Sequence, residues 1–158
     1  MADTRKLAAV MFTDIVGYTA LMSEDESAAI KLLQKNGEIQ SSLAKQHNGE
    51  FIKEMGDGTL LCFNSALDAV RCALEIQQVS KGWPNLKLRI GIHIGDTLFK
   101  NGDIFGDGVN VASRIEPLAK PGEVYISEQV LHIVRNQSEM ESDFIGEKQL
   151  KNCLLYTS

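Results

Sequence analysis

The chain has 158 residues, of which 44% are hydrophobic, so it is the size of one domain with a single sizeable core. Its 16 Lys and Arg against 21 Asp and Glu give a net charge of −5. Because the positive charges do not cluster, this balance argues against a nucleic-acid or anionic-membrane surface. No apolar run approaches the roughly 20 residues of a membrane span, and no secretory segment precedes the first predicted strand. We therefore expect a cytoplasmic protein with no nucleic-acid or membrane partner.

The cysteines Cys62, Cys72 and Cys153 lie far apart among apolar neighbours and form no Cys-x-x-Cys motif. This spacing argues against a disulfide framework and against a zinc site. We predict buried free thiols, which is the usual state of cysteine in a reducing cytosol.

The first predicted strand covers residues 7–12, an apolar run that is too short for an independent helix. It places Asp14 at the carboxyl end of the strand. Gly17 then allows a sharp turn or a close approach of the backbone to a ligand. This stretch alone leaves open whether Asp14 is a turn former or a metal ligand. Hydroxyl groups that suit a phosphate occur on Thr13, Tyr18 and Thr19.

Helical and strand patterns alternate along the rest of the chain. Ser23-Glu-Asp-Glu26 matches a capping box at the start of a helix, Gly56-Asp57-Gly58 is typical of a hairpin turn, and Gly95-Asp96 is expected to end or bend a strand. The predicted elements are a helix over about 24–46, strands over 51–55 and 59–63, a helix from Ser65 to the Gly82-Trp83-Pro84 stop, a strand over 86–94, a helix within 107–115, a strand over 123–126 and a helix over 127–135.

Residues 97–103 are either a further strand or a loop closed by Asn101-Gly102. The alternation of strands and helices, together with the hairpin, predicts an α+β sandwich with a mixed or largely antiparallel central sheet flanked by helices. We expect a single domain over residues 1–158, with no internal repeat.

Four stretches place polar residues beside glycine or on a helix within apolar surroundings. Asp14 and Asp57 each lie beside a turn, where they are either ligands of Mg²⁺ or Mn²⁺ on a polyphosphate or unrelated turn aspartates. Asn110 and Arg114 share one helix face, which either binds a sugar and a phosphate or is simply solvated. Lys53 is either a binding residue or an exposed strand lysine with no specific role. The stretches are 13–17, 53–58, 102–106 and 110–114.

As a set, these segments resemble the catalytic domain of the class III nucleotidyl cyclases, which are the adenylate and guanylate cyclases. Within that family they resemble an adenylate cyclase of the bacterial type. They occur in the family's order, at compatible spacing, over roughly residues 7–133. The matching segments are Phe12-Thr-Asp-Ile-Val-Gly-Tyr-Thr19, Ile52-Lys-Glu-Met-Gly-Asp-Gly58, Arg89-Ile-Gly-Ile-His-Ile-Gly95 and Asp103-Ile-Phe-Gly-Asp-Gly-Val-Asn-Val-Ala-Ser-Arg114. The resemblance implies the cyclase fold, a ferredoxin-like sandwich. His93, within the third segment, is expected to be a packing or hydrogen-bonding histidine.

The resemblance also implies a metal and phosphate site. Asp14 and Asp57 fall on the family's two metal-binding aspartates, which hold two Mg²⁺ or Mn²⁺ ions. The main-chain carbonyl of Ile15 is a further metal ligand, and Lys151 matches a lysine that contacts the β- and γ-phosphates. The residues of the implied phosphate cradle are Ile15, Val16, Gly17, Tyr18 and Thr19.

Lys53 and Asp103 fall on the family's purine-selecting pair. A lysine and an aspartate there read adenine, whereas guanylate cyclases typically carry glutamate and cysteine, so ATP is the implied substrate. Asn110 matches the residue that orients the ribose, and Arg114 the one that stabilises charge on the α-phosphate in the transition state. The implied reaction converts ATP to 3′,5′-cyclic AMP and pyrophosphate, which is the chemistry of a phosphorus-oxygen lyase in signal transduction.

The family builds its site between two head-to-tail domains, and this chain carries both sets of residues. The resemblance therefore implies a homodimer with two composite sites, and any regulatory domain would lie outside this chain. The region 144–158 departs from the family, because no proline and little room follow Lys151 for the last strand. A catalytically impaired nucleotide-binding or dimerisation module is therefore the alternative function. A guanylate cyclase is a weaker one, and a phosphodiesterase-like metal enzyme weaker still.

Overall fold

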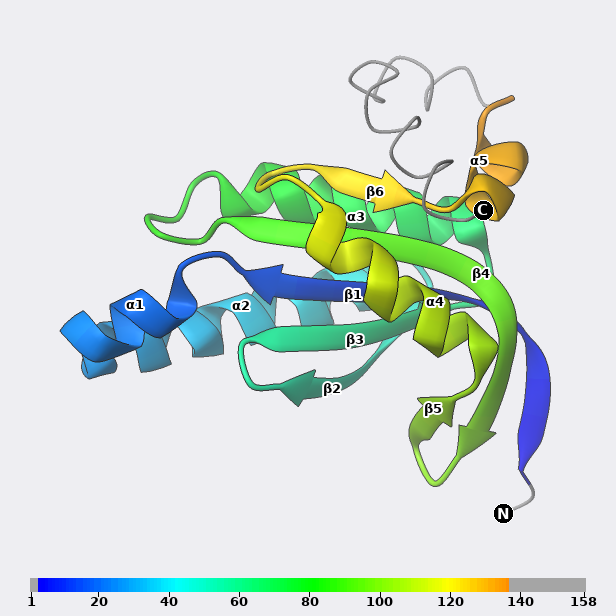
Figure 1. Cartoon of the computed structure of the whole chain (residues 1–158), viewed down its shortest axis with the longest axis horizontal. Helices are drawn as coiled ribbons and strands as arrows, with labels where there is room; N and C mark the ends of the chain where they lie inside the picture. Colours follow the sequence, from blue (N-terminus) through cyan, green and yellow to red (C-terminus); the bar gives the residue numbers. More distant parts are fainter. Residues whose placement is uncertain (1–2, 137–158) are drawn as a thin grey trace.

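The computed structural model describes residues 3–136 of the protein, in which strands and helices alternate (Figure 1). Lys151, Cys153 and the atypical region 144–158 lie outside the described residues. The strands are β1 (Thr4–Ile15), β2 (Gly49–Met55), β3 (Gly58–Phe63), β4 (Leu88–Lys100), β5 (Asp103–Phe105) and β6 (Val124–Ile126). The helices are α1 (Tyr18–Glu24), α2 (Glu26–Gln46), α3 (Ala66–Ser80), α4 (Asp107–Ile115), the short 3₁₀ helix η1 (Glu116–Leu118) and α5 (Glu128–Val134).

The strands form one sheet in the order β2-β3-β1-β4-β5, in which all neighbours are antiparallel. β6 joins β4 in parallel, with Ile90 opposite Val124. The prediction of an α+β fold with a mostly antiparallel sheet flanked by helices is therefore confirmed. The sheet is held together by long-range pairing, since β1 and β4 pair along the whole length of β1.

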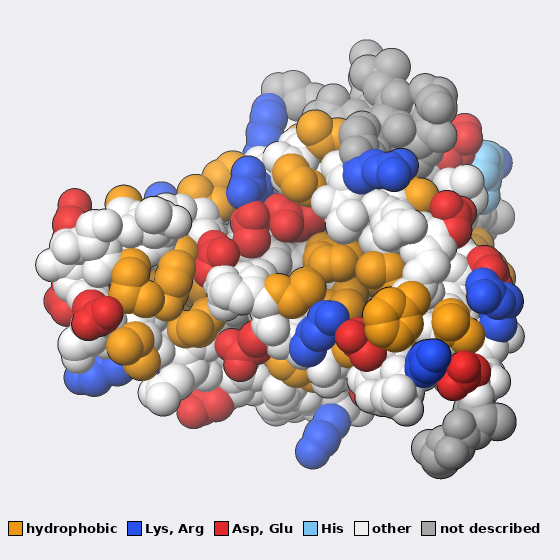
Figure 2. All heavy atoms as spheres, turned by 60° about the horizontal axis from the view of Figure 1, so that its bottom comes forward, with side chains coloured by type: hydrophobic (Ala, Val, Ile, Leu, Met, Phe, Trp, Pro, Cys, Tyr) orange, Lys and Arg blue, Asp and Glu red, His pale blue; other side chains and the backbone are white. Residues whose placement is uncertain are grey.

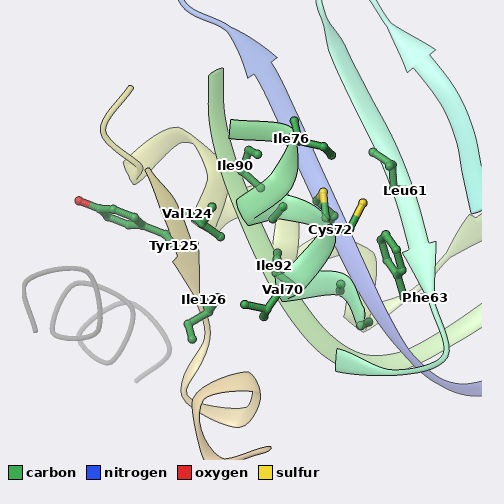
Figure 3. Packing of buried hydrophobic residues seen from close by; sticks show 14 of the residues in the cluster. Leu61, Phe63, Val70, Cys72, Ile76, Ile90, Ile92, Val124, Tyr125 and Ile126 are labelled. Carbon is green, nitrogen blue, oxygen red and sulfur yellow. The ribbon is translucent and has the colours of Figure 1, made fainter. Parts of the chain in front are cut away.

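The two faces of the sheet carry different cores, because side chains alternate along each strand. Ala9 and Met11 of β1 belong to the larger cluster under α2 and α3, whereas Ala8 and Val10 belong to the smaller cluster, which includes Ala112 of α4. Figure 1 shows α2 and α3 behind the sheet and α4 in front of it. In the larger cluster, the isoleucines of β4 pack with the apolar side chains of α3 (Figure 3). Asp14 therefore lies on the α4 face.

β4 does not end at Gly95-Asp96, so of the two predicted alternatives the strand end was wrong, and the continuous strand is strongly curved (Figure 1). The strand continues to Lys100, turns at Asn101-Gly102, and returns as β5. Gly95 serves close packing instead, because a Cβ there would lie 3.0 Å from Gly108 Cα in α4. A Cβ on Gly91 would lie 2.5 Å from Glu116 N. These two glycines of the Arg89–Gly95 motif let α4 and η1 lie directly on β4.

The predicted helix over 24–46 corresponds to α2, which begins at Glu26, whereas α1 was not predicted and the capping box at Ser23 was wrong. Asp25 breaks the helix with φ −153°, and its carboxylate accepts a hydrogen bond from Ala28 N at 3.1 Å to cap α2. Ser23 instead lies within α1. The caps at Ser65 and Ser127 are confirmed, since each hydroxyl accepts from the backbone N–H three residues later.

Cys62 and Cys72 are buried free thiols, as predicted. Burial raises the pKa of Cys62 to about 11 and that of Cys72 to about 12, so both are protonated at neutral pH. Among residues 3–136, no helix combines the length and the apolar character needed to cross a membrane.

The packing of α4 and η1 on β4 predicts that Gly91→Ala destabilises the protein. The new methyl group would meet the backbone of Glu116 at 2.5 Å, and overpacking of this kind costs about 1–3 kcal/mol. Urea unfolding measures the loss. Gly82→Ala is the control, because its Cβ would come no closer than 3.4 Å to Val79 O. Equal stability of the two variants would contradict the packing argument.

Candidate active site

A bidentate ion pair closes the end of the sheet on the α4 face. Asp14 lies next to the end of β1 and is paired in register with Arg89 of β4 and Gly58 of β3. Arg89 Nε donates to Asp14 Oδ1 at 2.9 Å, and its Nη2 donates to Oδ2 at 2.5 Å. The hydrogen bond to Asp14 raises the pKa of the Arg89 guanidinium above its ordinary value. The predicted metal ligand Asp14 thus has its charge compensated by a cross-strand partner.

Glu116 adds a second carboxyl group to this ion pair. It is the first residue of η1, and its side chain is 11% exposed, with Oε2 3.6 Å from Arg89 Nε. This oxygen has no hydrogen-bond partner among residues 3–136. Burial, followed by the interactions with Asp14, raises the pKa of Glu116 to about 8. Burial therefore favours the neutral, protonated form of Glu116.

Asp57 completes an acidic cluster with these residues. It lies in the turn between β2 and β3, where Gly56 has φ 63°, and its charge raises the pKa values of both Arg89 and Glu116. Three carboxyl groups and one guanidinium share this end of the sheet. Carboxylate oxygens suit Mg²⁺ or Mn²⁺. Within residues 3–136, no group of three or more Asp, Glu, His or Cys has a metal-binding arrangement, so an ion held by Asp14 and Asp57 needs additional ligands.

The residues from Ile15 to Thr19 form a tight turn from β1 into α1. Gly17 has φ 79°, a left-handed conformation that favours glycine. Val16 N donates to Lys87 O at 2.7 Å, which ties the turn to the chain just before β4. Thr13 does not belong to this turn. Its hydroxyl lies on the opposite face of the sheet and is buried, so the prediction that it suits a phosphate was wrong.

Lys53 and Asp103, the residues of the predicted purine-selecting pair, form an ion pair with each other. Lys53 Nζ donates to Asp103 Oδ2 at 2.8 Å, and Ile104 N donates to Oδ1 at 2.7 Å. The hydrogen bond from Lys53 is the main cause of the lowered pKa of Asp103. An irregularity in the β2–β3 register between Phe51 and Lys53 shifts the alternation of β2 by one residue. This bulge turns Lys53 to the same face as Leu60, its register partner.

Asn110 and Arg114 are exposed one helical turn apart on α4. The opposite face of this helix is buried through Gly108, Ala112 and Ile115. Among residues 3–136, neither Asn110 nor Arg114 has a side-chain hydrogen bond or ion pair. The pair is thus free to meet a ligand or a partner from the solvent side.

The predicted site residues fall into separate groups on the described chain. Asp14 lies with Arg89 and Glu116, and Asp57 lies within their electrostatic reach, whereas Lys53 pairs with Asp103. Within the part of the chain that the structure describes, no hydrogen bond or ion pair links these groups to one another. Figure 2 shows one face of the molecule, where apolar side chains are exposed between acidic and basic ones.

Two residues of the cluster were missed by the sequence analysis. Arg89 begins one of the quoted motifs, but no role was predicted for it, and the pairing of Asp14 with Arg89 depends on the strand register. Glu116 carries no signal beyond its place before Pro117. His93 is hydrogen-bonded as predicted, with its Nδ1 2.8 Å from Ser127 Oγ, and burial lowers its pKa.

Comparison with known proteins identifies the family. The sequence profile of the adenylate and guanylate cyclase catalytic domain matches residues 2–154. The chain therefore belongs to this family, the class III nucleotidyl cyclase domains. It is 39% identical over 156 residues to "Putative adenylate cyclase 3" of Rhizobium meliloti (strain 1021), covering 94% of this chain and 27% of that protein. The chain thus spans about a quarter of the length of that relative.

Solved structures agree with this assignment. The chain superposes on an adenylate/guanylate cyclase/hydrolase from Silicibacter pomeroyi with a TM-score of 0.78 and 37% identity, covering 86% of this chain and 84% of that one. The adenylyl cyclase CyaB from P. aeruginosa superposes with a TM-score of 0.79 and 26% identity, and the match covers 87% of this chain and 84% of that one. Guanylyl cyclase domains also match, so these comparisons alone leave the purine undecided.

The raised pKa of Glu116 predicts how stability depends on pH in the metal-free protein. Between its ordinary pKa of 4.5 and the folded value of about 8, the folded chain binds more protons than the unfolded chain. The contribution of Glu116 to the free energy of unfolding is therefore complete below pH 4.5 and is lost as pH rises toward 8, with a slope of at most about 1.4 kcal/mol per pH unit. Glu116→Gln should flatten this dependence.

Urea unfolding in EDTA across this pH range measures the effect. Glu24→Gln is the control, since it removes an exposed carboxylate at the end of α1. An unchanged pH profile in Glu116→Gln would show that Glu116 does not titrate in this window.

Proposed function

We propose that the protein is an adenylate cyclase, which converts ATP to 3′,5′-cyclic AMP and pyrophosphate. The observation that carries this proposal is the ion pair between Lys53 and Asp103, with its 2.8 Å hydrogen bond. A lysine donor and a carboxylate acceptor held side by side complement a ring nitrogen and the exocyclic amine of adenine. Guanine presents a carbonyl oxygen in place of that amine, and it would leave the carboxylate facing an acceptor.

The acidic cluster supports a metal-dependent reaction. Asp14 and Asp57 would hold two divalent ions, which activate the ribose 3′-hydroxyl and neutralise the triphosphate. The turn from Ile15 to Thr19 lies beside them and would receive the phosphates, with the Ile15 carbonyl as a further ligand. From outside the described residues, Lys151 would contact the β- and γ-phosphates.

Asn110 and Arg114 would orient the ribose and stabilise the reacting phosphate. In the reaction the 3′-oxygen loses its proton and forms a bond to the α-phosphorus, while the bond from that phosphorus to the pyrophosphate oxygen breaks. The guanidinium of Arg114 can donate two hydrogen bonds to the oxygens on which charge develops. Its exposure on α4 supports a role that begins only when substrate or a second domain arrives.

A homodimer with two composite sites accounts for the separation of these groups. Within the described chain no hydrogen bond or ion pair links Asp14 to Lys53 or to Arg114. A head-to-tail dimer would bring the acidic cluster of one subunit to the purine and α4 residues of the other. Substrate would then bind between the subunits, and a monomer would be inactive.

The proposed purine selection predicts a change of substrate preference. Purified protein should form cyclic AMP from ATP with Mg²⁺ or Mn²⁺ and little cyclic GMP from GTP. Lys53→Glu combined with Asp103→Cys should lower kcat/KM for ATP on the order of 100-fold, since two charged hydrogen bonds are lost. Arg5→Glu with Asp96→Cys is the matched control, because it alters another exposed cross-strand ion pair in the same way. An unchanged ATP preference in the first variant would refute the purine assignment.

The composite site predicts recovery of activity in mixed dimers. Asp14→Ala and Asn110→Ala should each be inactive, yet random mixing should restore about a quarter of the wild-type activity, because half of the dimers regain one of two sites. Mixing Asp14→Ala with Asp57→Ala is the control and should restore none, since both residues belong to the same half-site. No recovery from confirmed mixed dimers of the first pair would contradict a shared site.

A further inference from the structure

Four polar side chains are buried between α2 and the β1–β3 strand pair, on the face of the sheet opposite Asp14. Thr13 and Thr59 face each other across the two strands, and Gln40 and Asn36 lie one turn apart on α2. Each is at most 1% exposed. Burying polar groups in an apolar layer costs free energy unless each of them is hydrogen-bonded. Their presence between a helix and a sheet therefore calls for an explanation.

Three of these residues form a closed ring of hydrogen bonds. Thr59 Oγ1 donates to Gln40 Oε1 at 2.5 Å, and Gln40 Nε2 donates to Thr13 Oγ1 at 3.2 Å. The two hydroxyl groups are 2.5 Å apart. Because the Thr59 proton is already used, the Thr13 hydroxyl donates to Thr59. Each member of the ring donates once and accepts once within it, an arrangement in which hydrogen bonds reinforce one another.

Stability alone does not explain this ring. Gln40 Nε2 also donates to Asn36 Oδ1 at 2.8 Å, but Asn36 Nδ2 has no partner among residues 3–136. An unsatisfied buried donor costs about 1–3 kcal/mol. Apolar side chains of similar shape at these positions would avoid that cost. Unlike an apolar contact, a hydrogen bond depends on the direction between its two groups. The ring therefore fixes the position of both strands relative to α2.

The position of the ring connects it to the acidic cluster. Thr13 immediately precedes Asp14, and Thr59 follows Gly58, which is the register partner of Asp14. Asp57 immediately precedes Gly58. The ring therefore fastens both chain segments that carry the two aspartates to one helix, from the far side of the sheet. Carboxylates held close together repel each other before cations bind, so their spacing requires a restraint from the surrounding structure.

We propose that the Thr13–Thr59–Gln40 ring is a positioning device, which sets the spacing of Asp14 and Asp57 and thereby the affinity for divalent cations. This inference rests on the proposed function, since it assumes that the two aspartates bind metal. None of the ring residues touches substrate, so they act through the aspartates. Loss of a hydrogen bond made directly to a metal ligand typically costs 10- to 100-fold in metal affinity, and the ring acts one residue away from the aspartates, so we expect an effect at the lower end of this range.

The test separates positioning from stability. In an apolar variant, Thr13→Val, Thr59→Val, Gln40→Met and Asn36→Leu replace every member of the network by an apolar side chain of similar size. Because no partner is left unpaired, this variant should unfold at about the wild-type temperature. Its Mn²⁺ affinity, measured by EPR titration, and the Mn²⁺ concentration for half-maximal cyclic AMP formation should both be weaker by about 10-fold.

Two controls complete the comparison. Thr13→Ser with Thr59→Ser keeps both hydroxyl groups and should bind Mn²⁺ like the wild type. Thr97→Val removes another buried threonine hydroxyl, which donates to the carbonyl of Gly95 at 3.0 Å, eight residues along β4 from Arg89, and it should also leave Mn²⁺ binding unchanged. If the apolar variant does not fold, Thr59→Val alone opens the ring and must weaken Mn²⁺ binding in the same direction.

The outcomes distinguish this inference from the proposed function. Wild-type Mn²⁺ affinity in a folded apolar variant, or in Thr59→Val, would overturn the positioning role while leaving the cyclase proposal intact. Equal weakening in Thr97→Val would also overturn it, because the effect would then follow from the loss of any buried hydroxyl group. A wild-type protein that neither binds Mn²⁺ nor forms cyclic AMP would overturn the proposed function and this inference with it.

Discussion

The antiparallel pairing of β1 with β4 is the constraint on which the rest of the site depends. Its register sets Asp14 opposite Arg89 and lets the guanidinium bind both carboxylate oxygens. The same pairing fixes which side chains of β1 face α4 and which face α2. A slip by one residue would move Asp14 under α2, and it would bring the buried Thr13 to the α4 face. Register is therefore a chemical requirement in this protein as well as a packing one.

Close packing of α4 and η1 on β4 positions the other residues of the candidate site relative to Asp14. Gly91 and Gly95 leave room for the backbones of η1 and α4, so Glu116 reaches the Asp14–Arg89 pair while Asn110 and Arg114 project outward. The bulge in β2 has a similar effect on Lys53, which it turns toward Asp103. Glycines and a bulge, rather than charged residues, decide where the charged residues meet.

Much of the fold follows from local patterns. The apolar strand over residues 7–12, the caps at Ser65 and Ser127 and the hairpin around Asp57 depend on neighbouring residues, and the sequence predicted them. The failures have a common origin. Gly95 resembled a strand end because its true neighbour, Gly108, is brought to it by the fold. Ser23 resembled a cap because a single sequence does not show that Asp25 breaks the helix two residues later.

The sequence by itself determined the family, the alternating faces of the strands and most polar residues of the candidate site, because these follow from short motifs and short-range spacing. Only the tertiary structure decided which of these residues meet. Asp14 and Arg89 are 75 residues apart in the chain, Lys53 and Asp103 are 50 apart, and Thr13 and Gln40 are 27 apart. Contacts over such separations depend on strand register and helix packing, and these are set by the burial of the whole core rather than by any one segment.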